Sequence, residues 1–177
     1  MGDWYQVIVD LEAGETEAAR LGERAVAWLL EEGVVVADGD AYLPGPHWRR
    51  AVDDGWDREP YDELAVRVGR NVFISGADMP STAVCPRCAR TTALDDALWD
   101  RFGDALTAWY DTGEAVVECP ACAVPVPLPG WGWGEAPLAC GYLGLRFRNW
   151  PDLSDDFRAR ISTLLEGHRT AYLWGKI

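Results

Sequence analysis

The chain has 177 residues, of which 49% are hydrophobic and 25% charged, and its net charge is −13. This composition is typical of a globular protein and excludes a disordered chain, and the length suits one domain with an inserted subdomain. All basic residues except Lys176 are arginines. With the abundant alanine, glycine, aspartate and valine, this bias suggests the codon usage of a high-GC bacterium such as an actinobacterium.

The negative charge lies in the first 140 residues, because residues 141–177 carry 4 carboxylates against 6 basic side chains. An acidic surface repels nucleic-acid phosphates and attracts basic proteins, so we expect a protein partner and no nucleic acid. Residues 1–4 do not begin a secretion signal, and no apolar run reaches the roughly 20 residues of a membrane helix. We therefore expect a cytoplasmic protein that does not associate with a membrane.

The first eighty residues are expected to contain three strands and one helix. Aromatic and β-branched residues predict a strand over 4–9, and an apolar stripe at helical spacing predicts a helix over 16–32 that Gly33 ends. A short buried strand over 34–36 completes a β-α-β unit. A loop rich in Gly, Pro and Asp follows over 38–63. Residues 64–74 are strand-like, and Gly69-Arg70-Asn71 suggests a hairpin within them.

The second half of the chain is expected to contain two helices. An amphipathic pattern predicts a helix over 95–110, capped by Asp95 or Asp96 and ended by Gly113. Residues 115–118 are expected to form a strand, and the prolines of 124–129 require an extended segment. A half-buried strand over 143–147, a helix from Ser154 to Gly167 and a strand over 169–174 form a second β-α-β unit.

Four of the five cysteines form two pairs with the same spacing. The pairs read Cys85-Pro86-Arg87-Cys88 and Cys119-Pro120-Ala121-Cys122. In a reducing compartment, paired cysteines indicate metal or redox chemistry rather than disulfides. A gap of two residues lets both sulfurs of a pair reach one ion, and two such turns supply the four thiolates that structural zinc prefers. We therefore predict one structural zinc ion bound by Cys85, Cys88, Cys119 and Cys122.

Over about residues 84–128, these turns resemble the knuckles of zinc-ribbon proteins, which often read Cys-Pro-x-Cys-Gly. Here Ala89 and Ala123 stand in place of that glycine. The resemblance implies a structural zinc but no function, because ribbons serve nucleic-acid binding, protein docking and scaffolding alike. The spacing is also similar to that of rubredoxin, in which four thiolates hold iron for electron transfer, although the helix between the pairs is not rubredoxin-like.

Together these patterns predict an α+β fold. Residues 1–80 and 130–177 are expected to form the core domain, a mixed sheet built from two β-α-β units. Residues 81–129 are expected to form an inserted zinc-ribbon subdomain with its amphipathic helix.

The remaining cysteine and the two histidines are weighed as catalytic groups. A nucleophilic cysteine needs a nearby base, and only His47 and His168 could supply one. Nothing in the sequence completes a triad, so no catalytic residue is assigned. We expect Cys140 to be a packing residue, His47 a surface residue and His168 a helix cap. An enzyme that uses Cys140 or His47 stays open as an alternative.

Five residues are candidates for a binding surface. Trp131 and Trp133 are separated by glycine in an expected loop, and exposed loop tryptophans are enriched at binding hot spots. Trp56 lies beside acidic residues between positions 53 and 63 that could dock a basic partner. Arg146 and Arg148 form the best basic patch, but two arginines are too few for nucleic-acid binding.

The leading interpretation is a non-catalytic, zinc-stabilised protein-interaction module. One specific version is an immunity or antitoxin-like protein that binds a basic partner. An iron-binding electron-transfer protein and a Cys/His enzyme are the alternatives. The sequence does not fix the partner, the pathway or the oligomeric state.

Overall fold

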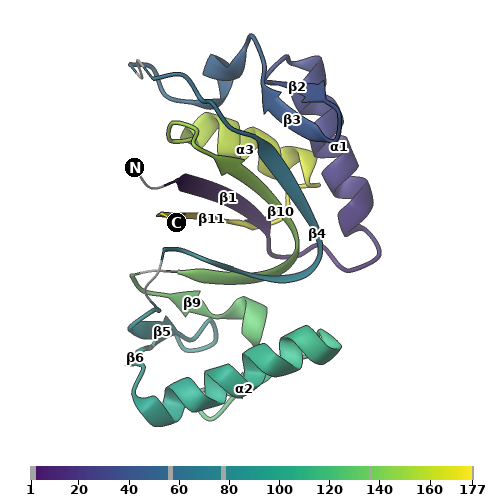
Figure 1. The fold of residues 1–177 in the computed structure, drawn as a ribbon. Coiled ribbons are helices and arrows are strands. Elements are labelled where there is room, and N and C mark those ends of the chain that lie inside the picture. Colours follow the sequence, from purple (N-terminus) through teal and green to yellow (C-terminus); the bar gives the residue numbers. More distant parts are fainter. Residues whose placement is uncertain (1–2, 56–57, 77–78, 136, 177) are drawn as a thin grey trace.

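The computed structural model of the chain describes residues 3–55, 58–76, 79–135 and 137–176. Its largest element is a six-stranded sheet, with two helices on one face and an insert at one end (Figure 1). The fold is α+β, as predicted. In spatial order, the strands of the sheet are β11 (Thr170–Lys176), β1 (Trp4–Asp10), β10 (Leu138–Arg148), β4 (Leu64–Ile74), β3 (Ala41–Pro44) and β2 (Val35–Asp38).

Each end of the chain supplies one of the two predicted β-α-β units. Helix α1 (Ala18–Glu31) connects β1 to β2, and helix α3 (Asp155–Leu164) connects β10 to β11. The ladders between neighbouring strands of this sheet are antiparallel. The two strands of each unit therefore run parallel to each other, but other strands of the sheet lie between them.

The predicted helix boundaries at Gly33 and Ser154 are confirmed, but α3 ends at Leu164 and not at the predicted Gly167. Gly33 follows α1 with a positive φ of 67°, a conformation that glycine adopts without strain. The side chain of Ser154 accepts a hydrogen bond of 3.2 Å from the backbone N–H of Phe157 at the start of α3. These local signals were readable because a cap depends on residues next to it in the chain.

Two predictions for the first half of the chain were wrong. Residues 38–63 are not all loop, because β3 lies within them and pairs with β2 through a tight turn in which Gly39 has a φ of +61°. The 3-10 helix η1 (Trp48–Ala51) follows β3. The hairpin predicted at residues 69–71 is a β-bulge: β4 continues through it, Gly69 has a φ of +106°, and the register with β10 shifts there.

The main core lies between the sheet and the two helices α1 and α3. Alternate residues of β10 point to this side, and the helices cover them. The fully buried members with the largest side chains are Ile8, Leu21, Leu29, Leu64, Leu143, Leu145, Phe147, Phe157, Ile161 and Leu165.

The insert occupies residues 82–133, between β4 and β10, two strands that pair with each other in the sheet. It contains β5 (Thr82–Val84), β6 (Thr91–Ala93), α2 (Asp96–Thr112), β7 (Val116–Glu118), β8 (Pro125–Pro127), η2 (Leu128–Gly130) and β9 (Gly132–Trp133). Figure 1 shows it against the curved ends of β4 and β10, with α1 and α3 at the opposite end of the view.

Two hydrogen bonds join the β-bulge in β4 to the last turn of α2. Arg70 donates a hydrogen bond of 2.8 Å to the carbonyl of Tyr110, where the negative end of the helix dipole favours a cation. The indole N–H of Trp109 donates to the carbonyl of Asn71 at 3.2 Å. The insert is therefore fastened to the sheet through its helix. Among the described residues, no helix combines the length and apolarity needed to cross a bilayer.

Candidate metal centre

The four paired cysteines converge at one point of the insert. The sulfur atoms of Cys85, Cys88, Cys119 and Cys122 all lie within 4.8 Å of one another, and those of Cys88 and Cys119 are 3.9 Å apart. A tetrahedron with metal–sulfur bonds of about 2.3 Å has sulfur–sulfur edges of about 3.8 Å. The observed spacing fits such a tetrahedron, so the cluster could hold a metal ion.

Two hairpins of the same construction carry these cysteines. The first cysteine of each pair follows a three-residue strand, β5 or β7, and its sulfur accepts a hydrogen bond of 3.4 Å from the backbone N–H two residues later. The residue after each second cysteine donates its N–H to the carbonyl of the first at 2.8 Å. These residues, Ala89 and Ala123, both have a φ of +56°. The two cysteine pairs therefore have the same backbone geometry as well as the same spacing in sequence.

The electrostatics of the cluster favour a bound cation. Burial raises the pKa of the Cys119 thiol, but the backbone N–H groups of Ala121 and Cys122 lower it further, to about 7. The backbone N–H of Val124 lowers the pKa of Cys122, whereas burial and the sulfurs of the other three cysteines raise it, to about 11. The neighbouring sulfurs therefore oppose ionisation of the Cys122 thiol, and a central divalent ion would remove that opposition.

An aromatic layer packs beside the cysteines. Phe102 of α2 is fully buried and meets the rings of Trp131 and Trp133 edge-on, with centroid distances of 5.1 and 5.0 Å. The expectation that Trp131 lies exposed in a loop was wrong: it is 5% exposed and belongs to the core of the insert, and Trp133 is half-buried in β9. A tryptophan in a Gly-rich segment looked like a loop residue because the helix that covers it lies thirty residues away in sequence.

The predicted basic patch is occupied by partners within the chain. Arg148 forms ion pairs with Asp3 and Asp62, at 3.6 and 3.4 Å. The guanidinium of Arg146 lies 4.3 Å from the centre of the Tyr5 ring, and its burial lowers its pKa. Neither side chain is a free cation for a binding surface. Trp56, the remaining candidate, lies outside the described residues.

The structure places Cys140 where a thiol is unreactive. It is 2% exposed in the hydrophobic cluster shared by the insert and β10. Burial raises the pKa of Cys140 to about 12, which suppresses the thiolate that a nucleophile requires. His47 is exposed, and its Nδ1 lies 3.1 Å from the carbonyl oxygen of Glu32. Both placements agree with the packing and surface roles expected for these residues.

The pair formed by His168 and Asp10 was not predicted. Asp10 is fully buried, and its carboxylate accepts hydrogen bonds of 2.9 Å from the backbone N–H groups of Glu12 and Ala13. Nδ1 of His168 lies 2.9 Å from the same carboxylate, whose hydrogen bond raises the pKa of His168. The pair joins the end of β1 to the segment before β11, which are 158 residues apart. The helix-cap role expected for His168 was wrong, because Leu165 is the C-cap of α3 and the ring of His168 contacts Asp10 instead.

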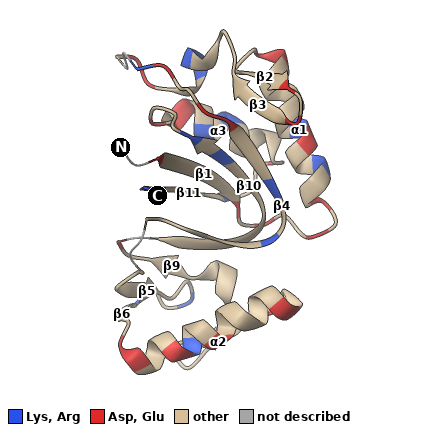
Figure 2. Cartoon of the chain, viewed as in Figure 1, with Lys and Arg blue, Asp and Glu red and all other residues tan. Residues whose placement is uncertain are grey.

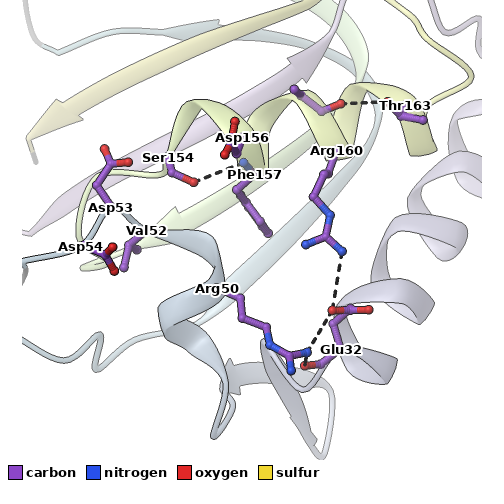
Figure 3. Close-up of a pocket in the computed structure, with 11 residues that line it drawn as sticks. Glu32, Arg50, Val52, Asp53, Asp54, Ser154, Asp156, Phe157, Arg160 and Thr163 are labelled. Carbon is purple, nitrogen blue, oxygen red and sulfur yellow. Dashed lines mark hydrogen bonds and ion pairs between the residues drawn. The ribbon is translucent and has the colours of Figure 1, made fainter.

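A groove of about 1020 Å³ lies where η1, α1 and α3 meet (Figure 3). At one end Glu32 is neutralised by Arg50 and Arg160, at 3.0 and 3.6 Å. Asp53, Asp54 and Asp156 gather at the other end, and the described lining contains no cysteine or histidine that could act as a nucleophile or base. This groove shows charge but no catalytic arrangement.

Comparison of the chain with protein-family models, with curated proteins and with solved structures found no match. The cysteine cluster therefore provides the strongest chemical signal in the described residues. Four thiols at the tips of two like hairpins form a site able to hold one metal ion.

Proposed function

We propose that this protein is a non-catalytic, zinc-stabilised protein-interaction module. The observation that carries the proposal is the convergence of four sulfurs within 4.8 Å, in hairpins whose strands are three residues long. Hairpins this short are not stable alone, and zinc has no redox chemistry and favours four thiolates in a tetrahedron. The ion would thus act as part of the core of the insert.

The interaction role rests on charge and on the thiol and histidine environments. Figure 2 shows acidic residues along α2 and along the segment before β4, and the net charge of the chain is −13. Such a surface attracts basic proteins and speeds their encounter. The buried Cys140 and the exposed His47 give no support to nucleophilic catalysis. An immunity or antitoxin-like protein with a basic partner is one specific version.

A second candidate is an electron-transfer protein that holds iron. It is favoured by the partial exposure of Cys88 and Cys122, which would bring the metal near the surface. Four thiolates hold iron as readily as zinc, so geometry alone does not separate the two ions.

Elemental analysis of the purified protein, together with its visible spectrum, tests the metal. One zinc per chain and no colour is the expected result. One iron per chain with a red colour would replace the scaffold role with electron transfer.

The interaction role needs a separate test. The tagged protein is used to capture partners from an extract of its own host at low salt, and each captured protein is then purified and rebound. We expect at least one basic partner whose affinity falls as salt rises, because surface charge pairs are screened. If no captured basic protein binds again after purification, the result would count against the interaction role, whichever metal is bound.

A further inference from the structure

A second cleft, of about 930 Å³, lies where α3 leaves β1 and β11 uncovered. We call it the aromatic cleft and define it by Trp4, Tyr61, Tyr172 and Trp174, which line it. Trp4, Tyr61 and Trp174 are 45%, 57% and 59% exposed. Trp4 and Trp174 stand at the ends of neighbouring strands, with ring centroids 6.3 Å apart. Large aromatic side chains grouped on an open surface are typical of binding sites rather than of solvent-facing structure.

The rim of the cleft is acidic. Among the described residues, its lining contains five carboxylates, Asp53, Glu59, Asp152, Asp155 and Asp156, and two basic side chains. This excess of negative charge in the lining has the same sign as the net charge of the chain, and it favours a cationic ligand.

The rings of the cleft already contact cations of the chain itself. The guanidinium of Arg58 lies 5.2 Å from the centre of the Tyr61 ring, and the ammonium of Lys176 lies 5.4 Å from that of Trp4. Arg158, the second basic residue of the lining, is held over Tyr172 and paired with Asp155. No cation of the described residues lies over Trp174, so its face is available to a cation from outside.

The cleft extends beyond the aromatic rings. It shares Asp53, Ser154 and Asp156 with the groove of Figure 3, so the two cavities meet at the start of α3. The adjoining groove carries a further carboxylate, Asp54. Carboxylates spread over two joined cavities fit an extended chain with several charges better than a single small cation.

We propose that the aromatic cleft binds a basic peptide segment of a partner protein, with an arginine or lysine side chain stacked on Trp174. Neighbouring cations of that segment pair with the carboxylates of the rim and of the adjoining groove. This proposal rests on the proposed interaction function and identifies the surface that performs it.

The test measures binding of a fluorescein-labelled hexa-arginine peptide to the full metal-loaded chain by fluorescence anisotropy, with a hexa-glutamine peptide for comparison. An acidic protein attracts polyarginine non-specifically, so the decisive variant, Trp174→Ala, leaves the charge unchanged. Its matched control is Tyr110→Ala, which removes an aromatic side chain of similar exposure (53%) from α2. Trp174 is exposed on an edge strand, so its replacement should leave the fold intact, which circular dichroism checks.

A second pair of variants tests the rim. The double variant Glu59→Gln with Asp152→Asn removes two charges from the cleft, and Asp104→Asn with Asp111→Asn removes two from α2. We expect Trp174→Ala and the cleft double variant each to weaken peptide binding about tenfold. Trp174→Phe should retain most of the affinity, and both α2 controls should stay within about twofold of the wild type, because an exposed side chain outside the site contributes little.

The outcomes separate this proposal from the interaction function. If the wild type binds the peptide but Trp174→Ala binds equally well, the cleft proposal is overturned, while a rebound basic partner would still support the interaction role. If the wild type ignores hexa-arginine but binds a neutral oligosaccharide such as cellohexaose in a manner lost in Trp174→Ala, the cleft is a sugar site and the proposal is overturned. Binding of neither probe also overturns it.

Discussion

The two halves of this molecule build their cores in different ways. The main core of the sheet region is a large cluster of hydrophobic side chains, on strands as long as the 11 residues of β4 and β10, and hydrogen-bonded polar residues such as Gln6 and Asp10 are buried beside it. The insert has four strands of 3 residues each, and two of its paired cysteines lie among the residues of its core. The described members of the first core include no cysteine, whereas the second core places thiols beside its leucine and aromatic side chains.

The contrast indicates that the two regions are stabilised by different interactions. Long strands bury enough apolar surface to offset the loss of chain entropy, but two short hairpins do not. In the insert, a tetrahedral ion would replace the missing surface and fix both hairpins at once. We therefore expect the sheet to fold with or without metal, and the insert to depend on it.

Removal of the metal should give the largest difference in stability between the insert and the sheet region. Structural zinc typically contributes about 10 kcal/mol or more to folding, so stripping the ion with a chelator should unfold the insert. Hydrogen exchange by mass spectrometry is the measurement. Residues 82–133 should lose protection, while β1, α3 and β11 keep it.

The same experiment has a matched pair of variants. Cys119→Ser should lose the metal, whereas Cys140→Ala, which removes the buried thiol outside the cluster, should retain one ion per chain. Unchanged protection of the insert after chelation would mean that apolar packing alone holds it, and the comparison would fail.

The next largest effect is expected from replacing two equally buried phenylalanines, one in the core of the sheet region and one in the core of the insert. Phe147 and Phe102 are both 0% exposed and both meet other aromatic rings edge-on. Replacing a buried phenylalanine by alanine costs about 3–5 kcal/mol. Phe147→Ala should lower the global free energy of unfolding by that amount and leave metal affinity within about threefold of the wild type, because the ion does not contact the sheet core.

Phe102→Ala should act on the metal instead. Folding of the insert is coupled to metal binding, so a loss of about 3 kcal/mol should weaken zinc affinity about a hundredfold. Competition with a chromophoric chelator measures both variants. Equal effects on zinc affinity would show that the two regions form one cooperative unit.

The pH dependence of stability should report on the sheet region alone. The hydrogen bond that His168 makes to the carboxylate of Asp10 raises the pKa of His168 above its ordinary value of 6.5. A raised histidine pKa stabilises the fold fully below pH 6.5, and this contribution is lost as the pH rises through the pKa of the folded state. Urea unfolding of the sheet with zinc in excess should therefore show falling stability from pH 6 to pH 8.5.

His168→Gln should remove this part of the dependence and lower stability at pH 6. His47→Gln, which removes the exposed histidine, should keep the wild-type slope. An unchanged slope in His168→Gln would show that the contact with Asp10 contributes nothing to folding.

Features of the fold and of the site could be predicted from the sequence where the residues involved lie close together along the chain. The cysteine spacing, the caps at Gly33, Asp95 and Ser154 and the three helices are local patterns, and each was predicted. The burial of Trp131 depends on a helix distant in sequence, and the pair of Asp10 and His168 on opposite ends of the chain. Such contacts are set by strand order, which periodicity does not reveal.

The bulge at Gly69 was misread for a related reason. A glycine at positive φ serves a hairpin turn or a bulge equally well, and only the partner strand decides between them. Trp4 and Trp174 could have been noticed as aromatic ends of the first and last strands. Their pairing in one cleft became visible only once β1 and β11 were known to be neighbours.

The smallest expected effect concerns the two alanines of the knuckles. Ala89 and Ala123 have a φ of +56°, a left-handed conformation that costs a residue with a Cβ atom about 1–2 kcal/mol. Glycine removes this strain but loses more conformational freedom on folding, which offsets about 0.4–1 kcal/mol. Ala89→Gly and Ala123→Gly should therefore each stabilise the insert by less than about 1 kcal/mol, measured as tighter zinc binding of up to about fivefold.

Because the two knuckles share the same backbone geometry, the two substitutions should have equal effects. As a control, Ala108→Gly in α2 should destabilise the insert by about 1 kcal/mol instead. A clear difference between the two knuckle variants would mean that the hairpins do not contribute equally to the site.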